Sequence, residues 1–147
     1  MYSRILVPLD GSDVAECALT EVRKLVESRM VSEIVLLSVV VIPSMAVGEG
    51  FDYPMFRKTH FKRYELYLER IRSKIASEGI TVTTEVEEGN ASQMIINYVK
   101  KHAMDLIVIA THGYSGMKKL MFGSVALQVL HDSDVPVLLI RPKIHKE

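Results

Sequence analysis

The sequence has little of what would crosslink a small domain or carry it into a membrane. Its 147 residues contain one cysteine, Cys17, so an internal disulfide cannot form. Cys17 lies among apolar residues of a predicted helix, where we expect a small buried side chain. The longest apolar run, Ile34–Ile42, is interrupted by Ser38 and is far too short to cross a bilayer. No signal-peptide pattern precedes the first predicted strand, so we expect a cytoplasmic protein without a membrane partner.

An excess of charge of either sign is also missing. The 18 Lys and Arg residues balance the 18 Asp and Glu residues, so no broad basic field favours nucleic acid as a partner. The five histidines show no metal-ligand spacing, and we expect no metal site in the protein itself. His112 has no acid, cysteine or second histidine beside it, so we expect a polar contact rather than a catalytic base and assign no catalytic residue.

Two common nucleotide-binding signatures are absent. The first predicted strand is not followed by G-x-G-x-x-G, which argues against classical dinucleotide binding. The pattern G-x-x-x-x-G-K-[ST] occurs nowhere, so the chain is not a P-loop hydrolase. The length fits one domain over residues 1–147, long enough to bury a core without disulfides or metal.

The sequence does contain five segments with the character of buried strands. Four are nearly continuous runs of Val, Ile and Leu, typical of parallel strands covered on both faces. They are Arg4–Leu9, Ile34–Val41, Leu106–Ala110 and Val137–Arg141. The segment Thr81–Val86 alternates between polar and apolar residues and is predicted to lie at a sheet edge. Helical patterns between the strands predict an open parallel sheet with helices on both faces.

Four helices are predicted from the spacing of apolar residues. Ser12 is placed to cap the first helix, whose inner face would hold Ala15, Ala18, Val22 and Leu25. The other three predicted helices are the stretch from Phe61 to Ile75 ended by Gly79, the stretch Ser92–His102, and a stretch from about Gly123 to Asp132.

The segment Pro43–Pro54 fits neither the strand nor the helix pattern. It holds two glycines, two prolines and several small residues, which is typical of a loop. Such a loop is either a lid over a ligand or a plain connection.

The most informative motif follows the fourth predicted strand. Ala110–Gly113 is separated by nine residues from Gly123–Ala126, where a helix is predicted to begin. Glycines let backbone N–H groups approach an anion closely, and the unpaired N–H groups of a helix start attract negative charge. The motif therefore predicts a phosphate site, although the same glycines can simply permit tight turns.

A carboxylate ends the first predicted strand. In an open α/β sheet, ligands bind outside the carboxyl ends of the strands, where the direction of winding reverses. If the first and fourth strands are neighbours, Asp10 faces the glycine loop across that crevice. Its carboxylate can then accept hydrogen bonds from an adenine amino group or from ribose hydroxyls. Alternatively, Asp10 caps the first helix or shapes its turn.

These segments together resemble the universal stress protein family over essentially the whole chain. The resemblance rests on Ile5–Ser12, the Gly89 turn, Asp105–Val108, Ala110–Gly113 with Gly123–Val125, and Val135–Arg141. It implies a single doubly wound α/β domain whose five-stranded parallel sheet has the order 3-2-1-4-5. It also implies a homodimer formed through the last strand, Val137–Ile140, and a bound ATP or other adenine nucleotide. Any Mg²⁺ is expected to arrive with that nucleotide.

Carried over by position, the resemblance implies ten nucleotide-binding residues. Those expected beside the base and sugar are Pro8, Leu9, Asp10, Val39, Ile109 and Ala110. Those expected at the phosphates are Gly113, Gly123, Ser124 and Val125, with the Ser124 hydroxyl as an added donor.

The chain departs from the family pattern at two positions. Ala110 stands where the family has its first glycine, and Tyr114 stands where relatives often carry a basic residue. Lys118 and Lys119 either compensate for that lost charge or simply face solvent. An alanine at positive φ costs about 1–2 kcal/mol, so we expect Ala110 at ordinary strand-end angles.

The function predicted from the sequence is adenine-nucleotide binding in a cytoplasmic homodimer, with the nucleotide acting as a state signal for a stress-response regulator. The client protein is unknown. Two alternatives stay open. One is a nucleotide-free dimeric interaction module of the same fold, and the other is a slow hydrolase of phosphoryl or adenylyl groups.

Overall fold

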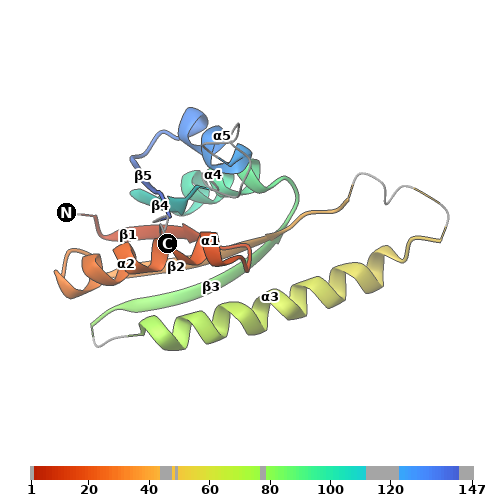
Figure 1. The fold of residues 1–147 in the computed structure, drawn as a ribbon, viewed down its shortest axis with the longest axis horizontal. Helices are drawn as coiled ribbons and strands as arrows, with labels where there is room; N and C mark the ends of the chain where they lie inside the picture. The colour runs from red at the N-terminus through yellow and green to blue at the C-terminus, as the bar shows by residue number, and fades with distance from the viewer. Residues whose placement is uncertain (1, 44–47, 49, 77–78, 112–122, 143–147) are drawn as a thin grey trace, which may run out of the picture.

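Five parallel strands form one sheet in the order β3-β2-β1-β4-β5 (Figure 1). The computed structural model describes residues 2–43, 48, 50–76, 79–111 and 123–142. The strands are β1 (Arg4–Pro8), β2 (Glu33–Val40), β3 (Thr81–Glu88), β4 (Leu106–Ala110) and β5 (Val137–Ile140). The predicted strand order 3-2-1-4-5 is therefore confirmed.

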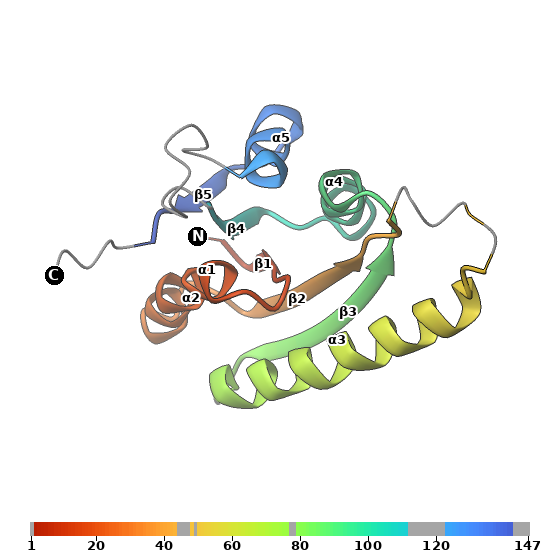
Figure 2. The same cartoon turned by 45° about the vertical axis from the view of Figure 1, so that its right-hand side comes forward.

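Helices cover both faces of this sheet, and Figure 2 shows the two layers on either side of the strands. One layer contains α1 (Asp13–Glu16), α2 (Ala18–Glu27) and α3 (Tyr53–Ile75), and the other contains α4 (Ala91–His102) and α5 (Ser124–Asp132). Successive strand residues point to opposite faces, so Ile5 and Val7 pack in the first layer while Leu6 packs in the second.

The central strands are buried because both of their faces are covered. Every residue of β4 is buried, whereas every residue of β3 is half-buried or exposed. The prediction of an edge position for the segment Thr81–Val86 is confirmed. At the opposite edge, β5 is only partly covered, and its Leu138 side chain is exposed. No helix in the described part of the chain is long and apolar enough to span a bilayer.

The first predicted helix is wrong in one respect, because it is two helices with a break at Cys17. The Cys17 N–H donates to Val14 O at 3.1 Å, which closes α1 with a tighter turn, and α2 starts at the next residue. Cys17 is half-buried rather than buried. The predicted cap is confirmed, since Ser12 Oγ accepts a hydrogen bond from Ala15 N at 3.1 Å.

Helix α3 is longer than the sequence pattern predicted. It begins at Tyr53, where Asp52 Oδ1 accepts from Met55 N at 3.0 Å, so the last two residues of the predicted loop Pro43–Pro54 are helical. Pro54 is tolerated because the first turn of a helix needs no intrahelical N–H donor. The prediction that Gly79 ends this helix is wrong, because α3 ends at Ile75.

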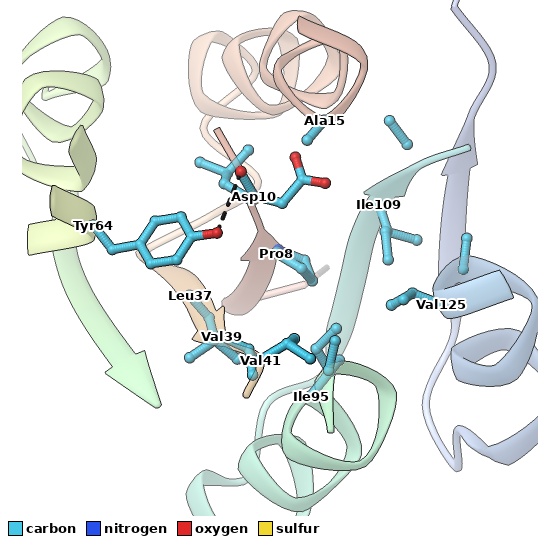
Figure 3. Close-up of a pocket in the computed structure, with 14 residues that line it drawn as sticks. Pro8, Asp10, Ala15, Leu37, Val39, Val41, Tyr64, Ile95, Ile109 and Val125 are labelled. Atoms are coloured by element: carbon cyan, nitrogen blue, oxygen red, sulfur yellow. Dashed lines mark hydrogen bonds between the residues drawn. The ribbon is translucent and has the colours of Figure 1, made fainter. Parts of the chain in front are cut away.

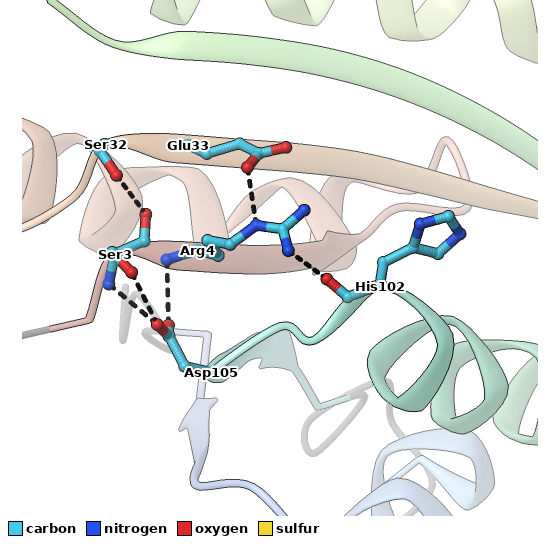
Figure 4. Close-up of polar contacts among 6 residues, drawn as sticks. All are labelled: Ser3, Arg4, Ser32, Glu33, His102 and Asp105. Atoms are coloured by element: carbon cyan, nitrogen blue, oxygen red, sulfur yellow. Dashed lines mark hydrogen bonds and ion pairs between the residues drawn. The ribbon is translucent and has the colours of Figure 1, made fainter.

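A carboxylate ties together the amino ends of the central strands (Figure 4). Asp105 precedes β4 in sequence, and its Oδ2 accepts from Ser3 N at 3.1 Å and from Ser3 Oγ at 3.0 Å. Its Oδ1 accepts from Arg4 N at 3.0 Å. Arg4 in turn forms an ion pair with Glu33 at 2.7 Å and donates to His102 O at the end of α4. One side chain thus fixes the amino end of β1 against the residue that precedes β4.

We predict that Asp105→Ala lowers the free energy of unfolding by about 2 kcal/mol, because two N–H groups and a hydroxyl lose a charged acceptor. Urea denaturation measures this difference. The matched control is Asp134→Ala, whose carboxylate is 78% exposed and 3.7 Å from Lys100 Nζ. Its loss should change stability by less than about 0.5 kcal/mol. Equal effects of the two substitutions would contradict the role of Asp105.

Candidate functional site

A pocket of about 210 Å³ opens at the carboxyl ends of β1, β2 and β4 (Figure 3). This position follows from the strand order, because β1 lies where the winding of the sheet changes direction. Seven of the ten predicted site residues line the pocket, and they are Pro8, Leu9, Asp10, Val39, Ile109, Ala110 and Val125. The structure thus brings most of the candidate residues together around one cavity.

The walls of the pocket are mainly aliphatic. Val39 and Ile95 lie along one side in Figure 3, and Ile109 and Val125 lie along the other. Among the lining residues, Asp10 and Tyr64 are the two with charged or hydroxyl side chains. An apolar cavity with a few polar groups is the usual form of a small-molecule site, and it suits a flat ring system.

The main chain of β2 adds polar groups to this apolar wall. Leu9 N donates to Leu37 O at 2.8 Å, which is the last bond between β1 and β2. On the other side, Gly89 N donates to Val40 O at 3.0 Å. Along a strand, the N–H and C=O groups of successive residues point alternately to the neighbour on one side and the neighbour on the other. The main-chain groups of Val39 therefore point to the same side as those of Leu37, toward β1, which has already ended there. Among the described residues, no main-chain hydrogen bond joins Val39 to β1.

Asp10 builds the turn that ends β1. Its Oδ1 accepts from Ser12 N at 2.9 Å and from Ser12 Oγ at 2.5 Å. The turn also needs Gly11, whose φ of +85° is a left-handed conformation that other residues rarely adopt. Asp10 therefore shapes its turn, as one alternative from the sequence held, and it also lines the pocket.

The opposite end of the pocket is formed by the start of α5. Val125 and Ala126 line the cavity, and the N-cap residue Gly123 makes no side-chain capping bond. The first N–H groups of any helix have no intrahelical acceptor, and at α5 no side chain of the N-cap residue takes that place. Gly123 has φ −60° and ψ 144°, which any residue can adopt, so its backbone does not require glycine. Ser124 is exposed and is not a lining residue.

A buried hydroxyl directly follows the last residue of β4. Thr111 follows Ala110 directly, has no exposed surface, and its Oγ1 has no hydrogen-bond partner among the described residues. Thr111 N donates to Ile140 O at 2.9 Å, which extends the sheet ladder by one residue. By the alternation of the strand, its side chain lies on the face of Ile107 and Ile109, which pack against α4 and α5.

The expectation for Ala110 is confirmed, because its φ is not among the positive values in the chain. The predicted contact Gly113 lies outside the described residues, as do His112, Tyr114, Lys118 and Lys119. In the described part of the chain, no three His, Cys, Asp or Glu residues are grouped so that they could hold a metal ion.

Sequence reasoning missed the residues that α3 and α4 contribute to the pocket. Tyr64 comes from α3, and Ala91 and Ile95 come from the first turns of α4. Tyr64 was visible only as one member of an apolar stripe, which indicates core packing. Its Oη donates to Asp10 O at 3.4 Å, across 54 positions of sequence.

Comparison with known proteins agrees with this geometry. The sequence profile of the universal stress protein family matches residues 1–141. The chain belongs to the universal stress protein family. A curated member, universal stress protein YxiE of Bacillus subtilis, is 32% identical over 149 residues, which cover 96% of this chain and all of the relative.

Solved universal stress proteins share the fold. The structure of MJ0577 of Methanocaldococcus jannaschii has a TM-score of 0.85 and 26% identity, and the match covers 98% of this chain and 99% of that chain. A family protein from Arabidopsis thaliana, solved with AMP bound, has a TM-score of 0.66 and 18% identity over 98% of this chain and 94% of its own. At that identity the likeness is one of fold.

We predict that Gly11→Ala destabilises the protein by about 1–2 kcal/mol, because alanine is strained at the φ of +85°. Open space surrounds the position, so the loss would come from the backbone alone. Gly48→Ala is the control, since a Cβ there also meets nothing within 4 Å and its φ is ordinary. Thermal unfolding of both variants measures the effect. An equal fall of the two unfolding midpoints would contradict the role of Gly11 in the turn.

Proposed function

We propose that this universal stress protein binds an adenine nucleotide, ATP or AMP, in the pocket at the ends of β1, β2 and β4. The observation that carries the proposal is the combination of an aliphatic slot with two sets of main-chain groups that have no main-chain partner among the described residues. Val39 supplies one set at the β2 side, and the start of α5 supplies the other. A ligand with a flat base and an anionic tail matches both.

The base end favours adenine over guanine. The N–H and C=O of Val39 offer one donor and one acceptor along the strand, and adenine presents an acceptor at N1 and a donor at N6. Guanine presents the reverse order on the same edge. Val39, Ile95 and Ile109 would cover the faces of the ring, as the apolar lining suggests.

The phosphate end rests on the start of α5. Its unpaired N–H groups and the positive end of the helix dipole attract an anion. Thr111 Oγ1 is a buried hydroxyl with no partner among the described residues, and a bound phosphate would satisfy it. Any Mg²⁺ would come with the nucleotide, since the described residues offer no cluster of metal ligands.

The regulatory part of the proposal is that bound nucleotide reports the state of the cell to a client protein. The AMP found in the plant relative of the same fold supports nucleotide binding by analogy. The cytoplasmic location and the single-domain extent over residues 1–147 stay predictions. The two alternative functions are slow hydrolysis of phosphoryl or adenylyl groups and a nucleotide-free interaction module.

We predict that ATP with Mg²⁺ raises the melting temperature, because a ligand that binds only the folded state stabilises it. At a hundredfold excess over the Kd the gain is about 2.7 kcal/mol. GTP should stabilise less. Gly123→Val should abolish the ATP effect, because a branched side chain would fill the approach to the start of α5. Its backbone angles accept valine, so the variant should fold.

Two results would contradict this assignment. A melting temperature unchanged by millimolar ATP, ADP and AMP would favour the nucleotide-free interaction module. A folded Gly123→Val protein that binds ATP as tightly as the parent would show that the start of α5 does not hold the phosphates. Turnover of ATP well above background would instead favour the hydrolase.

We further propose that the protein is a homodimer paired through β5. The two sheet edges differ in chemistry. The β3 edge carries Glu85 and Glu87, so pairing it with a second copy would bring like charges together. The segment Val137–Ile140 is uncharged and partly exposed, and Leu127 and Leu130 on α5 add exposed apolar surface. An open apolar edge of this kind favours pairing with a second copy.

We predict that Leu138→Lys converts the dimer to a monomer, because a charge would be buried at the two-fold contact. Leu139 is less suitable for this test because its side chain packs against the α4–α5 core. Leu66→Lys is the control, because the Leu66 side chain is 62% exposed and lies on α3 rather than on β5. Light scattering at micromolar concentration decides the question, and a monomeric parent or a dimeric Leu138→Lys protein would contradict the interface.

A further inference from the structure

Tyr64 is the residue that α3 contributes to the lining of the pocket. It reaches the cavity from α3, while the remaining lining residues come from β1, β2, β4 and the helices next to them. Figure 3 shows its hydroxyl turned toward the main-chain oxygen of Asp10. The distance of 3.4 Å makes this a long hydrogen bond, so the hydroxyl can turn to a closer partner at little cost.

The Tyr64 hydroxyl is a donor at neutral pH. Burial raises the pKa of Tyr64, and the negative charge of Asp10 raises it further, while Arg63 acts in the opposite direction. The phenol is therefore protonated and can both donate and accept a hydrogen bond. The neighbouring Asp10 carboxylate is an acceptor that already shapes the turn with Ser12.

The parts of a nucleotide can be assigned to the pocket by chemistry. The base needs the apolar walls and the free edge of Val39. The phosphates need the start of α5, and the charge of Asp10 would repel them from the Tyr64 side. The remaining group is the ribose, whose hydroxyls both donate and accept, as the end formed by Asp10 and Tyr64 requires.

We infer that Tyr64 is a specificity-determining residue whose hydroxyl hydrogen-bonds a ribose hydroxyl of the bound nucleotide, so that the pocket selects ribonucleotides over deoxyribonucleotides. This inference rests on the proposed function. A site built to bond a hydroxyl discriminates against the analogue that lacks it, because the half-buried Tyr64 hydroxyl then loses the partner that the ligand supplied.

The test compares ATP, 2′-deoxy-ATP and 3′-deoxy-ATP by calorimetric titration of the parent protein and of Tyr64→Phe. The parent should bind ATP about three- to tenfold more tightly than at least one deoxy analogue. Tyr64→Phe should bring that ratio close to one by weakening ATP while leaving the affinity for that analogue unchanged. The phenyl ring keeps the wall, so a general loss of binding is not expected.

Tyr53→Phe is the matched control. Tyr53 lies on the same helix, is 42% exposed, and donates to Glu88 Oε1 at 2.5 Å rather than lining the pocket. This variant should keep the full ratio between ATP and the deoxy analogue. Thermal unfolding of both variants confirms that each is folded.

Three results would overturn the inference, and they are distinguishable. A parent that binds ATP and both deoxy analogues equally has no ribose selectivity. If Tyr64→Phe keeps the parent's ratio, or weakens all three ligands by one factor, Tyr64 does not contact the sugar hydroxyl. A parent that binds none of the three ligands overturns the proposed function itself, and this inference with it.

Discussion

The early end of β1 is the constraint on which the site depends. β1 pairs with β2 only as far as Pro8 opposite Leu37, whereas β2 continues to Val40 with β3 as its remaining neighbour. The Asp10–Gly11 turn takes the chain away into α1, and the Ser38 hydroxyl donates to Leu9 O at 2.7 Å. A notch is left in the middle of a sheet that is otherwise continuous.

This notch is polar at its margins and apolar inside, because strand ends differ from strand middles. Within a ladder, each peptide group has a partner on a neighbouring strand. Where β1 stops, the main chain of Val39 faces a cavity instead. Most of the surrounding side chains still belong to the two cores, so they are mainly aliphatic. An apolar slot with main-chain groups at its rim follows directly from unequal strand lengths.

Thr111 shows a local disagreement between stability and site geometry. Thr111 Oγ1 has no hydrogen-bond partner among the described residues, and a buried hydroxyl left without one costs about 1–3 kcal/mol. An aliphatic residue would suit the same position in a purely structural core. Such exceptions are concentrated at functional sites, where a residue is selected for its contact with a ligand rather than for the empty fold. Thr111 directly follows Ala110, which lines the pocket.

The sequence patterns by themselves determined the strands and their parallel arrangement, and the family resemblance of the sequence implied seven of the residues that line the pocket. Strands such as Leu106–Ala110 can be predicted because a strand buried on both faces must be apolar throughout. Turn positions such as Gly11 can be predicted because few residues other than glycine adopt their backbone angles. The start of α3 was harder to predict from the sequence, because its first turns carry no regular apolar stripe and the N-cap residue Asp52 is the signal that marks the start. Tyr64 could not be assigned, because an aromatic residue in a helical stripe packs in a core or lines a cavity with the same spacing. Only the tertiary structure decided between core packing and a place in the cavity wall, because the contact of Tyr64 with Asp10 depends on the path of α3 across the sheet. No local sequence pattern encodes the distance between two residues so far apart in the chain.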